Sequence, residues 1–93
     1  MTGKQFGSVW DAIEDSTAEA ENMKLRSALM MALEHHITAQ GWTQAEAARI
    51  LGVTQPRVSD LMRGKIDLFA IDTLVNMLTA AGLRVEMHVA KAA

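Results

Sequence analysis

The chain has 93 residues, which suits one compact domain and leaves little room for a catalytic cleft between domains. It contains no cysteine, which excludes disulfide scaffolds, thiolate zinc sites and thiol nucleophiles. The net charge of -2 is low for a protein that neutralises phosphates, but it is unevenly distributed. Residues 9–22 carry five acidic residues and no basic one, whereas residues 43–66 carry four basic residues against two acidic ones. One end is therefore acidic and the middle is mildly basic.

The first ten residues do not look like a targeting segment. They lack the basic start and the apolar stretch of a secretory signal, and no run of about 18 apolar residues occurs in the chain. We therefore expect a soluble, cytoplasmic protein that does not associate with membranes.

Residues 1–20 are expected to form an acidic segment with a short helix that Ser8 caps and that ends near Asp15. The pattern Ser16-Thr17-Ala18-Glu19 has the spacing of a capping box and predicts the start of a second helix. This second helix should reach Gln40, because no proline or glycine precedes Gly41. One face of it is predicted to carry four apolar residues spaced four apart: Leu25, Leu29, Leu33 and Ile37.

Two short helices are predicted next. Thr43 to Glu46 repeats the capping-box pattern, and Gly52 suits the end of the helix that it opens. A following helix should begin at Thr54 or Gln55, with Pro56 tolerated in its first turn, and end at Gly64.

The remainder of the chain changes its period. Residues 65–70 read as a connector in which Ile66, Leu68 and Phe69 are expected to tuck under the domain. A helix is predicted from Ile71 to Ala81. Beyond Gly82, apolar and polar residues alternate in a two-residue repeat, which predicts a strand whose apolar row is Leu83, Val85, Met87 and Val89.

The stretch from Gln44 to Arg63 has the spacing of a helix-turn-helix. Ala48 supplies the small residue where two steeply crossed helices touch, and Gly52 supplies the residue that is free to turn between them. The inward-facing apolar residues are Ala47, Leu51, Val53, Val58 and Leu61. The polar residues between them would face outward, so we favour a DNA-binding motif over a helical pair that only packs.

The residues from Gly41 to Ala48, Leu51 to Leu61 and Arg63 to Lys65 resemble the Xre-type, lambda-repressor-like DNA-binding domains, and more narrowly their HigA-like branch. The resemblance runs from about Glu21 to Val89. It implies a mainly α bundle of four to five helices, with the helix-turn-helix domain at 21–82. One departure is that the usual last helix of the family is replaced by a C-terminal strand, which together with the residues after it occupies 83–93.

The same resemblance implies that the helix starting near Thr54 enters the major groove of DNA. Gln55 would then bond to an adenine edge, and Arg57 to a guanine edge or a phosphate. For Asp60, contact with a cytosine amino group, steering of Arg57, and a solvated or intrahelical ion-pair role all remain open. The full set of DNA-binding candidates is Gln44, Thr54, Gln55, Pro56, Arg57, Ser59, Asp60, Arg63 and Lys65.

Three functions compete. The first is a homodimeric repressor of an inverted-repeat operator that also neutralises a RelE/HigB-type ribonuclease toxin, with the strand row as the dimer interface. The second is a regulator without a toxin partner. The third, a small hydrolase, is the weakest, because no paired carboxylates, Cys/His arrangement or phosphate-binding glycine loop is present.

We expect neither a cofactor nor a metal. The adjacent His35 and His36 lie on neighbouring faces of one helix and lack the spacing of helix-borne ligands. Trp42 is interpreted as a packing residue at the helix junction rather than a stacking platform for bases. The acidic segment with Trp10 and Ile13 is either a solvated helix face or a surface that docks on a basic partner.

Overall fold

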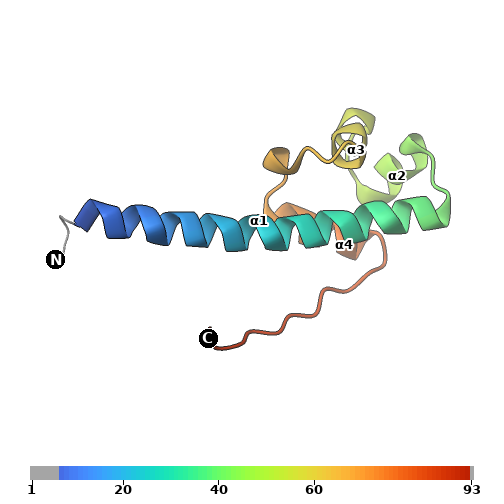
Figure 1. Cartoon of the computed structure of the whole chain (residues 1–93). Helices are drawn as coiled ribbons and strands as arrows, with labels where there is room; N and C mark the ends of the chain where they lie inside the picture. Colours follow the sequence, from blue (N-terminus) through green and yellow to red (C-terminus); the bar gives the residue numbers. More distant parts are fainter. Residues whose placement is uncertain (1–6, 93) are drawn as a thin grey trace.

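The computed structural model describes the backbone of residues 7–92 and the side chains of residues 17–92. This part of the chain is mainly α, as predicted, and contains no strand (Figure 1). Its elements are α1 (Gly7–Gln40), α2 (Gln44–Leu51), α3 (Gln55–Met62), the 3-10 turn η1 (Ile66–Leu68) and α4 (Ile71–Ala80).

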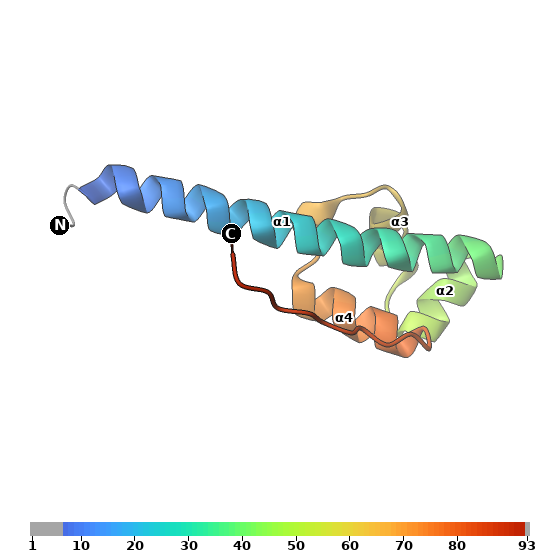
Figure 2. The same ribbon diagram turned by 60° about the horizontal axis from the view of Figure 1, so that its bottom comes forward.

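Helix α1 sets the length of the molecule. Its 34 residues span about 51 Å at the usual rise per residue, and the longest dimension of the chain is 53 Å. The other helices gather on its C-terminal half, while its N-terminal half extends beyond them (Figures 1 and 2). All side chains from residue 17 to residue 25 are exposed. None of the helices in the described residues combines the length and apolar character that a bilayer crossing requires.

The predicted separate helix before Ser16 is wrong, because α1 is continuous from Gly7 to Gln40. No proline or glycine lies between Gly7 and Gly41, and serine or threonine inside a helix costs only a few tenths of a kcal/mol. Local capping patterns therefore do not interrupt the helix. Ser8 lies within α1 and does not begin it.

The apolar face of α1 also differs from the prediction. Leu33 and Ile37 are buried and Leu29 is half-buried, but Leu25 is 56% exposed. A four-residue spacing overruns the 3.6-residue turn, so a row spaced in this way drifts around the helix and leaves the core. Met30 is buried on the inward side instead.

The core lies where α1, α2, α3 and α4 meet. Its largest fully buried side chains are Phe69, Leu33, Leu61, Leu74 and Val58. Phe69 is buried and Ile66 half-buried, as predicted, but Leu68 is 46% exposed. In a 3-10 turn, successive side chains point about 120° apart, so Ile66 and Leu68 cannot both face the core.

The predicted C-terminal strand is not formed in the single chain. Leu83 packs against the core and its N–H donates to the Leu78 carbonyl at 2.9 Å, but residues 84–92 form no backbone hydrogen bond within the described residues. A strand requires a neighbouring strand, and none is present here. The extended segment, residues 83–92, which we call the tail, leaves α4 and runs back in the direction of the N-terminus of α1 (Figures 1 and 2).

Candidate nucleic-acid interface

Both ends of α2 are built as the sequence predicts. The Thr43 hydroxyl accepts from the Glu46 N–H at 3.1 Å, and the Glu46 carboxylate accepts from the Thr43 N–H at 2.8 Å, which completes the capping box. Gly52 ends α2 in the left-handed conformation, with φ of 71°. A side chain is strained at that φ, so glycine allows the chain to reverse direction after barely two turns.

Helix α3 starts with an exposed polar turn. Thr54 is the cap, and its hydroxyl accepts from the Arg57 N–H at 3.3 Å. Pro56 occupies the first turn, where its missing N–H would have no partner in the helix. The opposite side of α3 is anchored by Val58 and Leu61, both fully buried. The buried side of α3 therefore fixes the helix on the core, while the outer side of its first turn stays accessible to solvent.

None of the nine predicted DNA-contacting residues is buried. Six are exposed, namely Gln44, Thr54, Gln55, Pro56, Arg63 and Lys65, and three are half-buried, namely Arg57, Ser59 and Asp60. Apart from Gln44 at the start of α2, they lie in α3 and in the segments flanking it.

Arg57 is positioned by an aromatic ring from outside the helix-turn-helix. The carbon of its guanidinium lies 4.2 Å from the centroid of the Phe69 ring, and Phe69 is 1% exposed. This cation–π contact holds the guanidinium over the ring without using its N–H groups in a hydrogen bond. The side chain makes no hydrogen bond or ion pair with another described residue. The free protein therefore holds a restrained guanidinium with its donors available.

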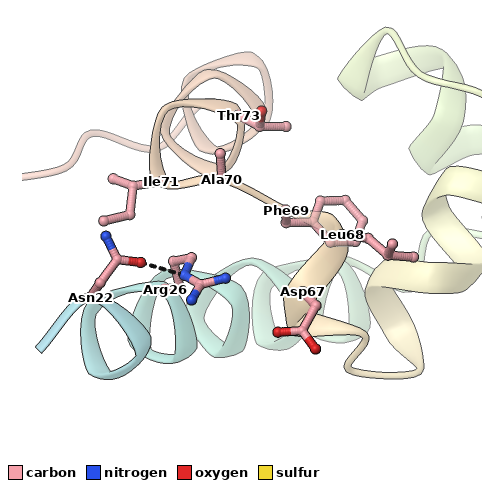
Figure 3. Close-up of a pocket in the computed structure, with 8 residues that line it drawn as sticks. All are labelled: Asn22, Arg26, Asp67, Leu68, Phe69, Ala70, Ile71 and Thr73. Atoms are coloured by element: carbon pink, nitrogen blue, oxygen red, sulfur yellow. Dashed lines mark hydrogen bonds between the residues drawn. The ribbon is translucent and has the colours of Figure 1, made fainter. Parts of the chain in front are cut away.

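The loop that carries Phe69 is tied to α1 by Arg26. Its Nη1 donates to the Ile66 carbonyl at 3.3 Å, and its Nε donates to Asn22 Oδ1 at 2.6 Å. Figure 3 shows Asn22, Arg26 and Phe69 around an open hollow between α1 and the start of α4. The volume of this hollow is about 410 Å³. Sequence reasoning missed the roles of Arg26 and Phe69, because no local spacing links either of them to α3.

Asp60 has a partner in the free protein. Its Oδ1 lies 3.6 Å from Lys65 Nζ, in a partly exposed ion pair with a residue beyond the end of α3. Such pairs are worth at most about 1 kcal/mol. Lys65 can therefore exchange this carboxylate for a phosphate at little cost.

The residues around the α1–α2 junction are structural. Trp42 is half-buried, packs against the core and meets the His36 ring edge-on at 5.4 Å between centroids, which confirms the packing role predicted for it. His35 is exposed. Burial raises the pKa of the Glu34 carboxyl on the same helix. Within the described residues, no group of three or more potential ligands could hold a metal ion.

Two short helices joined at a left-handed glycine, the second capped and presenting a polar first turn, define a helix-turn-helix protein. The profile of a helix-turn-helix domain family matches residues 12–90, and the chain belongs to this family. It is similar to a solved protein provisionally described as an XRE family transcriptional regulator, with 34% identity and a TM-score of 0.74 over 80% of this chain and 83% of that one. No curated protein matches the chain.

Proposed function

We propose that this chain is a sequence-specific DNA-binding transcriptional regulator, a repressor, that inserts the first turn of α3 into the major groove. The observation that carries this proposal is the exposed first turn, in which the Arg57 guanidinium rests on Phe69 with its donors free. A guanidinium edge matches the two acceptors of guanine, and the Gln55 amide matches the donor and acceptor of adenine. The description of the similar solved protein as a transcriptional regulator supports the same function.

The remaining exposed polar residues suit the DNA backbone. In this docking Gln44, Thr54 and Ser59, together with free amides at the helix starts, face phosphates, and Arg63 and Lys65 hold the flanking backbone. These contacts set register and orientation, while Gln55 and Arg57 read the bases.

We further propose that the regulator acts as a homodimer on an inverted repeat. The tail exposes an apolar row that a second copy can cover: Val85 is 36% exposed, and Met87 and Val89 are each 82% exposed. Antiparallel pairing of two tails, starting at Leu83, would satisfy their backbone groups and generate a two-fold axis. Two recognition helices should then lie about 34 Å apart, one turn of DNA.

A salt titration tests the backbone contacts. Lys65→Ala should weaken binding to specific and random duplexes alike, and it should flatten the dependence of log affinity on log salt by about 0.9, the value for one phosphate. Gel shifts at several salt concentrations measure this slope. Lys24→Ala, which removes the same charge from α1, is the matched control and should leave the slope unchanged. A loss confined to one duplex would contradict a phosphate role for Lys65.

A second proposed role is that of an antitoxin, for which the protruding part of α1 is the supporting observation. Glu19 and Glu21 are exposed there, where α1 extends beyond the other helices (Figure 1), and Glu21 forms an exposed ion pair with Lys24. A basic ribonuclease of the RelE/HigB type would complement this charge. Trp10 and Ile13, predicted to belong to the same surface, have side chains outside the described residues. Co-purification with the product of a neighbouring gene distinguishes the antitoxin from a regulator without a toxin partner, and the cytoplasm suits both.

A further inference from the structure

The tail carries charges as well as an apolar row. Arg84 and Glu86 lie two residues apart, so in an extended segment they share the face opposite that row. Arg84 Nη2 donates to Glu86 Oε2 at 2.7 Å, and the two side chains are 83% and 76% exposed. The polar face therefore presents one positive and one negative charge in a fixed order along the chain.

We propose that this charge order selects the register in which two tails pair, with the two-fold axis passing between Val85 and Val85 of a second copy. The proposal rests on the dimer of the proposed function and specifies its interface. In this antiparallel register Arg84 of each chain lies opposite Glu86 of the other. The two pairs within the chains and the two pairs between them form a ring of four charges of alternating sign.

The apolar face agrees with this register. Leu83 packs against the core of its own chain, and in this register it lies opposite Met87 of the second copy. Met87, which is 82% exposed in the single chain, is thereby brought to the edge of the other subunit's core. Val85 of one chain lies opposite Val85 of the second copy. Every cross-strand pair on this face is then apolar.

The neighbouring registers are less stable, because each places like charges, or a polar and an apolar residue, opposite each other. Centring the pair on Arg84 or on Glu86 places two like charges directly opposite each other, which is destabilising in a sheet. Centring it on Met87 places Lys91 of the second copy opposite Leu83. A shift that places unlike faces together would set apolar residues opposite polar ones along the whole tail.

Charge reversal tests the register. Arg84→Glu alone gives each tail two acids, and Glu86→Arg alone gives each tail two bases, so both cross-strand pairs become repulsive in either homodimer. We expect the dimer dissociation constant of each variant to rise about tenfold or more, as measured by sedimentation equilibrium at low salt. The increase should shrink in high salt, where exposed charges are screened. All these side chains are exposed, so the helical domain should remain folded.

A mixture of the Arg84→Glu and Glu86→Arg variants tests the register most directly. In the mixed dimer every cross-strand pair again joins opposite charges, so a 1:1 mixture should form heterodimers with about the wild-type affinity, resolved by native mass spectrometry. Lys91→Glu, an equal charge reversal outside the ring, should dimerise like the wild type. If Arg84→Glu dimerises normally, or if the mixture does not recover, the register is wrong although the regulator still dimerises. If the wild-type chain is monomeric throughout, both the register and the dimer are wrong, while DNA binding by α3 is judged separately on Arg57.

Discussion

Replacing Arg57 with alanine is expected to cost about 1–3 kcal/mol of affinity for the operator, or about 5–150-fold, because the proposed bidentate contact to guanine would be lost. Fluorescence anisotropy with a specific duplex and a random duplex measures the loss. The specific duplex should lose most of its advantage over the random one, since base contacts, unlike phosphate contacts, carry sequence information directly.

Arg57→Lys separates charge from geometry. It keeps the positive charge but loses the planar fork of the guanidinium that lies over Phe69. Binding to random DNA should therefore persist while the preference for the specific duplex falls. Equal affinities of the wild type and Arg57→Ala for the specific duplex would remove Arg57 from the interface.

Replacing Ala48 with leucine is expected to destabilise the fold and abolish DNA binding together. Ala48 is 7% exposed on α2 and is predicted to lie where α2 touches α3, so a larger side chain there should force the two helices apart. Overpacking of this kind costs about 1–3 kcal/mol, and each kcal/mol lowers the melting temperature of a domain of this size by about 4–8 °C. Thermal unfolding followed by circular dichroism, together with gel shifts, measures both effects.

Ala45→Leu provides the matched control for the same substitution. Ala45 lies in the same helix but is exposed, so the Ala45→Leu variant should unfold at nearly the wild-type temperature and bind DNA nearly as the wild type does. If Ala48→Leu also melted and bound normally, the contact between the two helices would have to lie elsewhere.

The helix-turn-helix itself was predictable because its determinants are local. Each determinant acts within a few residues: Thr43 with Glu46 begins α2, Gly52 ends it, and Thr54 begins α3. The inward positions of Ala47, Ala48 and Leu51 follow from the helical period in the same way.

The misses arose where local signals competed with longer-range structure. The capping pattern at Ser16 is a real local preference, but a helix that runs on without proline or glycine outweighs it. Phe69, which follows η1, and Arg57, which lies in α3, meet only through the tertiary fold, which no periodicity encodes. The alternation of the tail indicates a strand, yet the described residues hold no second strand with which it could pair.

The central claim is that the first turn of α3 reads a DNA sequence, and selection of bound duplexes from a random pool by the full chain tests it most directly. We predict enrichment of an inverted repeat with half-site centres about 10–10.5 base pairs apart, or a multiple of that spacing, with a guanine in each half-site whose enrichment disappears when Arg57→Ala is used. A pool with no enriched sequence, or the same sequence enriched by both proteins, would contradict it.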